Sequence, residues 1–141
     1  MIESIIIGGH ALWVHGWTSQ IHRLMEIARP DSNSFSTEST YWPAQPGMRF
    51  FPRPRHVMDE LARDAIPMNG MLLASPLAAL ADMIVMQGAA GLWLPGIEDL
   101  DEDCLEGRLS EVMAAMRRIH GRQVNPVPDL LQALTAFQPH P

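Results

Sequence analysis

The sequence predicts an α+β fold: a small sheet of short strands packed against several helices, with a helical C-terminal part. Short apolar or alternating segments, broken by proline and glycine, occupy the first half of the chain, and helical periodicity dominates after residue 75. The chain has 141 residues, of which 47% are hydrophobic and 18% charged. These values suit one globular core, so we expect residues 1–141 to form a single domain.

The first half contains three candidate strands. Residues 2–16 are open to strand or helix: IESIII favours a strand because isoleucine is β-branched, whereas GGHALWVHGW favours a short buried helix that ends at Gly16. QIHRLMEIARP alternates like a strand that stops before Pro30, and the polar residues 31–40 predict a loop. GMRFFPRP, residues 47–54, predicts an edge strand because Pro52 cannot donate to a ladder.

The second half is mainly helical. RHVMDELARDA, residues 55–65, allows two helical turns. Residues 70–88 predict a short strand and then a helix, with Ser75 as N-cap, Pro76 at the first helical position and Gly88 near the end. This helix is apolar nearly all round, so we expect it to be central and buried. A loop over 88–96 follows.

The C-terminal region contains two further predicted helices. Residues 97–122 predict one amphipathic helix with an acidic start and a basic end, as the helix dipole prefers. Its apolar face comprises Leu105, Leu109, Val112, Met113, Met116 and Ile119. Residues 127–137 predict a short closing helix through Leu130, Leu131, Leu134 and Phe137.

The composition limits the classes of function. A formal net charge of -6 argues against a chain that mainly coats nucleic acid or an anionic membrane. The single cysteine, Cys104, cannot form an internal disulfide or a thiolate zinc cluster. The N-terminus lacks a secretory signal, and the longest apolar stretch is too short to span a bilayer. We therefore expect a cytoplasmic protein without membrane contact.

A glycine pair, Gly8 and Gly9, follows the first apolar segment, as in a phosphate-handling turn. Nucleotidyltransferases that begin with such a turn hold magnesium with paired acidic residues close together at the end of a strand. The nearest acids here are Glu26 and Asp31, with no Asp-x-Asp between them, so we expect the glycines to be structural.

The histidines do not have the spacing of metal ligands. His10, His15 and His22 are five and seven residues apart, whereas two ligands on one helix face need a spacing of three or four. We therefore expect neither a metal site nor a cofactor.

Asp82 lies inside the otherwise apolar helix after Ser75. A buried carboxylate is costly unless it is paired or hydrogen-bonded. Asp82 is therefore either a catalytic acid that acts with a histidine or a structural residue that ties the helix to a loop, through an arginine or through exposed backbone amides. We favour the structural interpretation because structural ion pairs also perturb carboxylates.

Two charged segments are candidate contact surfaces. RFFPRPRH places four basic residues next to two phenylalanines, a pattern that can hold phosphates and stack bases but that also protects an edge strand from pairing. These basic residues are Arg49, Arg53, Arg55 and His56. The acidic run from Glu98 to Glu106 predicts a solvated helix entry or a face for a basic partner, and it should raise the pKa of Cys104.

Two stretches together resemble the AbiEi-type antitoxins of type IV toxin-antitoxin systems. In the first stretch, GGHALWVHGWTSQIHRLMEIARP, a predicted helix ends in a His-Gly pair, and a strand follows. In the second stretch, IPMNGMLLASPLAALADMI, a short strand is followed by a Ser-Pro dipeptide at the start of a helix that contains Leu-x-Asp. The residues carried over are Ala11, Leu12, His15, Gly16, Ser75, Pro76, Leu80 and Asp82. The similarity covers residues 5–90 and corresponds to the family's C-terminal region.

The resemblance implies a non-catalytic protein that counters a nucleotidyltransferase-like toxin through protein contacts. Family members usually begin with a winged helix-turn-helix that binds operator DNA, and no room for one precedes Ile5, so we expect nucleic-acid binding only with a separate DNA-binding domain. Homo-oligomerisation remains open. The alternatives are a divergent nucleotidyltransferase-like or hydrolase enzyme that uses Asp82 and a histidine, and a nucleic-acid-binding module that uses Arg49, Arg53 and Arg55.

Overall fold

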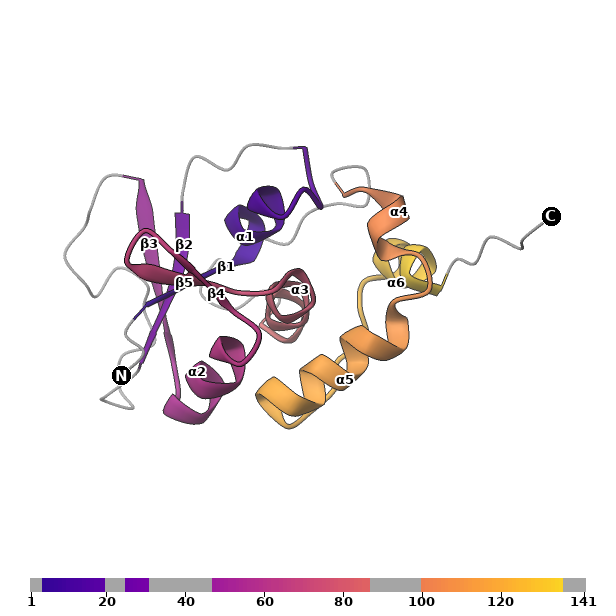
Figure 1. Cartoon of the computed structure of the whole chain (residues 1–141). Coiled ribbons are helices and arrows are strands. Elements are labelled where there is room, and N and C mark those ends of the chain that lie inside the picture. The colour runs from indigo at the N-terminus through magenta and orange to yellow at the C-terminus, as the bar shows by residue number, and fades with distance from the viewer. Residues whose placement is uncertain (1–3, 20–24, 31–46, 87–99, 136–141) are drawn as a thin grey trace.

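The computed structural model describes residues 4–19, 25–30, 47–86 and 100–135, and these contain five strands and six helices (Figure 1). The strands are β1 (Ile5–Ile7), β2 (Met25–Pro30), β3 (Met48–Arg53), β4 (Ile66–Met68) and β5 (Met71–Leu73). The helices are α1 (Gly8–Val14), α2 (Arg55–Ala62), α3 (Pro76–Val85), α4 (Glu102–Leu105), α5 (Leu109–His120) and α6 (Pro128–Thr135). The predicted α+β class is therefore confirmed.

The strands form one mixed sheet in the order β3-β2-β1-β5-β4. The central strand β1 is antiparallel to β2 and parallel to β5, β2 is parallel to β3, and β4 is antiparallel to β5. All three isoleucines of β1 are fully buried, as expected for a strand with neighbours on both sides. Its register partners Ile27 and Ala28 on β2 are buried too, so apolar rows run across the sheet.

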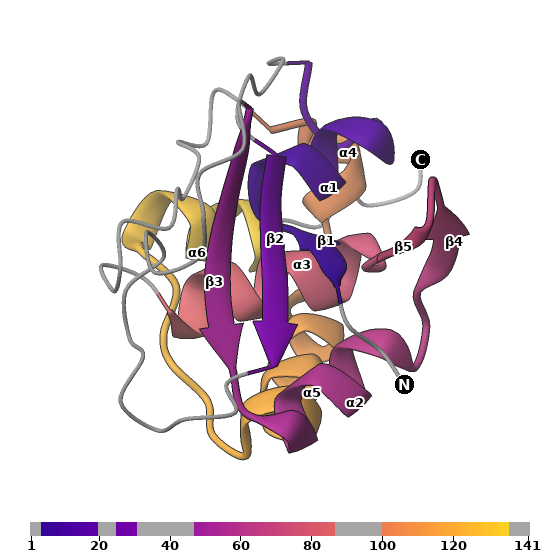
Figure 2. The ribbon, with the colours of Figure 1, turned by 90° about the vertical axis from the view of Figure 1, so that its left-hand side faces the viewer.

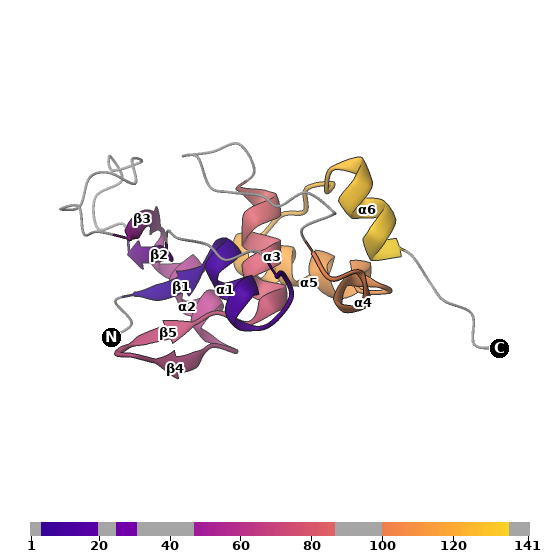
Figure 3. The same cartoon turned by 90° about the horizontal axis from the view of Figure 1, so that it is seen from above.

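The helices pack in two layers on one side of the sheet. In Figure 2 the described helices lie behind β2 and β3, and Figure 3 shows α3 between the sheet and the α4, α5 and α6 group. Helix α3 contacts α1 on one side and α5 on the other. The central, buried position expected for this helix is confirmed, since every residue from Ala78 to Val85 is buried.

The start of α3 follows the sequence prediction. The Ser75 side chain accepts a hydrogen bond from the Ala78 backbone N–H at 3.2 Å, and Pro76 occupies the first turn. The helix ends at Val85, three residues before Gly88, and Met86 is its C-cap. Gly88, which was predicted near the end of this helix, lies outside the described residues.

The predicted N-terminal elements are present with small shifts in their bounds. Strand β1 leads directly into α1, and Gly16 follows the helix with a φ of 80°. Strand β2 includes Pro30 instead of stopping before it, since Pro30 is its last residue and pairs in register with Arg53. The loops predicted over 31–40 and 88–96 lie outside the described residues, as does Phe137.

The single helix predicted over 97–122 is wrong. The chain forms two helices, α4 and α5, separated at residues 106–108, where Gly107 adopts a φ of 72°. A residue with positive φ cannot continue a right-handed helix. The predicted basic last turn of α5 is present, with Arg117, Arg118 and His120 before the left-handed Gly121 C-cap.

Strand β4 was not predicted from the sequence. It forms a hairpin with β5 through Asn69 and Gly70, whose φ values of 50° and 80° suit a two-residue turn with positive φ at both positions. The Asn-Gly dipeptide is the signal that predicts such a hairpin. Pro67 within a three-residue strand weakens that signal.

Both outermost described strands carry a proline whose nitrogen points away from the sheet. The Leu72 N–H donates to Ser4 towards β1, so Pro67, which is opposite Leu72, faces outward from β4. The Met25 N–H donates to Gly47, which by alternation places the Pro52 nitrogen on the outer side of β3. Pro52 and Pro67 therefore protect these edges from pairing with another strand.

Candidate functional site

Asp82 lies at the centre of a buried cluster contributed by β3, α3 and α5. The Arg53 guanidinium donates from Nε to Oδ1 at 3.1 Å and from Nη2 to Oδ2 at 3.0 Å. The His120 Nε2 lies 2.8 Å from Oδ1. Asp82 is 0% exposed and Arg53 is 2% exposed, so this ion pair is shielded from water. The cluster ties an edge strand to the central helix and to the outer helix layer.

The partners of Asp82 keep it ionised. Burial alone would raise the pKa of Asp82, but the charge of Arg53 and the hydrogen bonds from His120 and Arg53 lower this pKa to about 2. An ionised carboxylate only accepts hydrogen bonds, so His120 Nε2 carries the proton in this contact. Each charge in the cluster is therefore compensated, as a buried ion pair requires.

The chemical capacity of this cluster is narrow. A carboxylate that orients a histidine resembles the supporting half of a general acid–base pair. Here, however, Arg53 occupies both oxygens of the same carboxylate, and the His120 side chain is only 7% exposed. The carboxylate thus has three protein donors and no exposure to solvent.

A second buried carboxylate, Glu26, closes the glycine turn between β1 and α1. Glu26 Oε1 accepts a hydrogen bond from the Gly9 backbone N–H at 2.8 Å, and Glu26 is 4% exposed. Gly8 has a φ of 66°, and a Cβ at this position would overlap the Glu26 carboxylate. Gly8 is needed for this close approach of the turn to the strand, which agrees with a structural role.

This turn does not have the paired carboxylates that a magnesium site needs. The residue on the same face of β2, two positions after Glu26, is Ala28. Across the described part of the chain, no group of three or more histidine, cysteine or acidic residues is arranged to hold a metal ion. Asp31 and His22 lie outside that part.

The two stretches that resemble the antitoxin family lie side by side in the fold. His15, which follows α1, has its Nε2 2.8 Å from the carbonyl oxygen of Ala74, the residue before Ser75 and Pro76. A carbonyl only accepts, so this nitrogen carries the proton. The apolar motif residues are fully buried, namely Ala11, Leu12 and Leu80. Helices α1 and α3, which carry these residues, contact each other, and Asp82 joins α3 to Arg53 and His120.

The four basic residues of the 49–56 stretch do not form one surface. Arg53, predicted as a possible contact, is a core residue bound to Asp82, which removes it from any nucleic-acid interface. Arg49 lies over the Phe51 ring at 5.3 Å, whereas Arg55 and His56 are exposed. The local sequence does not show which of them is buried, because the burial of Arg53 depends on Asp82, 29 residues away on α3.

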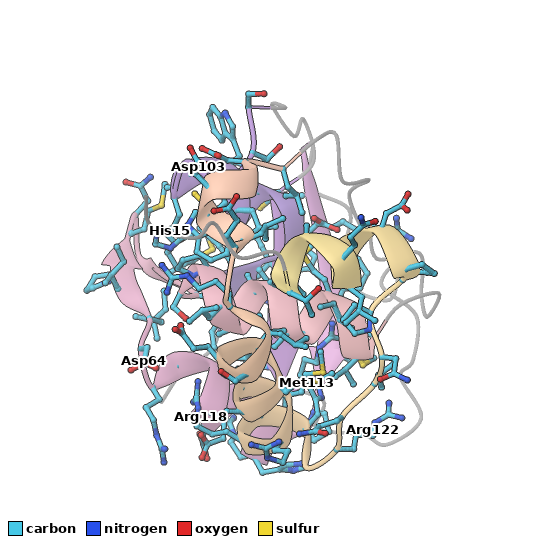
Figure 4. The ribbon with its side chains drawn as sticks, turned by 90° about the vertical axis from the view of Figure 1, so that its right-hand side faces the viewer. His15, Asp64, Asp103, Met113, Arg118 and Arg122 are labelled. Carbon is cyan, nitrogen blue, oxygen red and sulfur yellow. The ribbon has the colours of Figure 1, made fainter. Side chains whose placement is uncertain are left out.

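An ion cluster that the sequence does not predict joins α5 to the C-terminal end of α2 and the residues after it. Arg118 Nη1 lies 3.0 Å from Glu60 Oε2, and its Nη2 lies 3.6 Å from Asp64 Oδ2. Figure 4 shows Arg118 and Asp64 on the same side of the molecule. These residues are more than 50 positions apart in sequence, so no local pattern indicates their pairing. Their partial exposure limits this cluster to a modest structural contribution.

The raised pKa that the sequence predicts for Cys104 is confirmed. Burial and the nearby Asp101 carboxylate raise the pKa of its thiol.

No helix within the described ranges is long and apolar enough to cross a membrane. The chain matches no known protein-family model, and no curated protein matches it significantly. The resemblance to AbiEi-type antitoxins therefore depends on the motif residues alone.

Proposed function

We propose that this chain is a cytoplasmic, non-catalytic antitoxin-like or regulatory protein that acts through protein–protein contacts, as the AbiEi C-terminal region does. One observation carries the proposal. The carboxylate that the sequence indicates as a candidate catalytic acid, Asp82, has both oxygens bound by Arg53 and His120 inside the core. A residue engaged in this way stabilises the fold and leaves recognition to the surface.

The sheet edges favour recognition through side chains. An extended partner strand that joined β3 or β4 would meet Pro52 or Pro67 at an outward-facing backbone position. We therefore expect the partner, a nucleotidyltransferase-like toxin in the antitoxin interpretation, to contact helix and loop surfaces.

Affinity purification of the tagged chain from its native host, followed by mass spectrometry, tests the proposal. We expect stoichiometric recovery of one nucleotidyltransferase-like protein, and recovery should survive nuclease treatment. A preparation that yields nucleic acid, with binding that weakens steeply as salt increases, would instead indicate a nucleic-acid-binding module. A chain recovered without any partner contradicts the proposal.

A second candidate function is an enzyme that uses Asp82 with His120, because these residues are hydrogen-bonded at 2.8 Å. The Asp82→Asn variant separates the two functions when it is assayed for both partner binding and hydrolase or nucleotidyl-transfer activity. A structural Asp82 predicts lower stability and no activity to lose at any temperature. Activity in the wild type that disappears in a folded Asp82→Asn protein would support the enzyme.

A further inference from the structure

The turn between β4 and β5 places an asparagine directly before a glycine. Asn69 and Gly70 are both exposed, and a Cβ added to Gly70 would meet no other group within 4 Å. No described residue forms a hydrogen bond with the Asn69 side chain. Figure 2 shows the hairpin at one edge of the sheet. The Asn69 amide and the backbone next to it are therefore accessible to water.

The hairpin opens at low cost because little holds β4. Among the described strands, β4 pairs only with β5, over three residues. Pro67, at its middle, has no N–H to donate, and Ile66 is 51% exposed. Edge segments with few buried contacts open with a free energy far below that of global unfolding. Opening releases Asn69 from its φ of 50°, so rotation of its backbone brings the side-chain Cγ to the Gly70 nitrogen.

We propose that Asn69 is a site of spontaneous modification, at which water converts the side-chain amide to an acid through a cyclic imide and thereby loosens the β4–β5 hairpin. The Gly70 nitrogen attacks Asn69 Cγ, so that a Cγ–N bond forms and the Cγ–Nδ2 bond breaks. The proton of the Gly70 N–H leaves with the side-chain nitrogen as ammonia. Water then opens the five-membered ring at one of its two carbonyl groups, and nothing is oxidised or reduced. This inference is independent of the proposed function.

The two ring-opening products differ in their effect on the turn. Opening at Cγ gives aspartate, which leaves the main chain unchanged. Opening at the backbone carbonyl gives isoaspartate, in which the main chain runs through Cβ and Cγ. Isoaspartate lengthens the turn by one backbone carbon, whereas Met68 and Met71 pair across a turn of two residues. We therefore expect isoaspartate at this position to loosen β4 from β5.

The other asparagines of the chain provide internal comparisons. The sequence contains three asparagines, namely Asn33, Asn69 and Asn125. Asn125 is also exposed, but it precedes Pro126, whose nitrogen has no proton to lose. Asn33 lies outside the described residues and precedes a serine, whose side chain hinders the attack. Only Asn69 is followed by a glycine, so we expect modification to be selective for it.

The test is prolonged incubation of the folded, full-length protein in mildly alkaline buffer. Peptide mapping by mass spectrometry, with fragmentation that distinguishes isoaspartate from aspartate, then follows each asparagine against a fresh sample digested in the same way. The Asn69 peptide should gain the mass difference between an amide and an acid, mainly as isoaspartate, while Asn125 stays unmodified. Asn69→Gly is the matched control, because Gly-Gly suits the same turn and has no amide to lose. Circular dichroism should show that this variant is folded.

A parallel sample unfolded in urea shows the reaction without the hairpin. Conversion of Asn69 in urea but not in the folded protein would mean that the turn protects the amide, and this overturns the inference. Absence of conversion in both samples overturns it as well. Preferential modification of Asn33 or Asn125 in the folded protein would also overturn it, because the glycine and the open turn would then not select the site.

Amide hydrogen exchange tests the effect on the hairpin. The Leu72 N–H donates to Ser4, so by alternation the N–H groups of Met71 and Leu73 point towards β4. These two amides should exchange faster in the isoaspartate fraction than in the Asn69→Gly protein. Equal exchange rates would overturn the loosening of β4.

Discussion

Replacement of Arg53 is the sharpest test of the buried cluster. Arg53→Met keeps an unbranched side chain at this site but makes it apolar, and it removes both guanidinium hydrogen bonds to Asp82. The carboxylate then remains in the core without its principal counter-charge. Loss of one partner from a buried ion pair costs about 3–5 kcal/mol. A domain of this size has a total stability of roughly 5–15 kcal/mol, so the variant should be close to the limit of folding.

The double variant Arg53→Met/Asp82→Asn isolates the origin of that cost. An asparagine side chain is neutral and still offers an oxygen to His120, so no unpaired charge remains in the core. The double variant should therefore be more stable than the Arg53→Met single variant, although it carries one more substitution. The resulting interaction energy should be on the order of 2–3 kcal/mol.

Urea denaturation at pH 7, followed by circular dichroism, measures these free energies of unfolding. Equal m-values across the series would show that the variants unfold from comparable native states. Two results would refute the reasoning. Arg53→Met could cost less than about 1 kcal/mol, which is the range of exposed pairs. Alternatively, the double variant could be as unstable as the single variant, which would mean that the residual charge on Asp82 does not matter.

Four other measurements test separate parts of the structure. The pKa of Asp82 in the folded protein is about 2, below the usual 3.8, so Asp82 contributes stability that is present above about pH 4 and lost as the pH falls towards 2. The free energy of unfolding measured across this range should fall less steeply in Asp82→Asn than in the wild type. Identical pH profiles would exclude this linkage. Ser75→Ala should cost about 1 kcal/mol by loss of the N-cap, and an unchanged denaturation midpoint would remove that assignment. Gly8→Ala should be more destabilising than Gly70→Ala, since both positions have positive φ but only a Cβ on Gly8 meets another side chain; equal costs in urea would contradict the close approach. Pro67→Thr should cause concentration-dependent association through β4 in sedimentation velocity, and a variant that behaves as the wild type would show that Pro67 does not protect this edge.

Local patterns in the sequence predicted most of the elements. Ser75 and Pro76 located the start of α3, β-branching located β1, and Pro52 marked an edge strand, because each of these effects depends on a residue and its immediate neighbours. The amphipathic pattern across residues 97–122 was misleading. Apolar spacing continued through the region, whereas one positive-φ residue, Gly107, ended the helix.

For the candidate site, the sequence is enough to show that Asp82 lies in an apolar helix and therefore needs a partner. That the partners are Arg53 and His120, which are 29 and 38 residues away, follows from the folded arrangement alone. The same holds for the position of Glu26 at the glycine turn and for the contact of Asp101, just before α4, with Trp17, just after α1. The cost of burying a charged side chain depends on its own apolar segment, so the sequence shows that the charge of Asp82 must be compensated. The residues that compensate this charge come from the elements that pack against α3, and the periodicity of a single segment does not predict which elements those are.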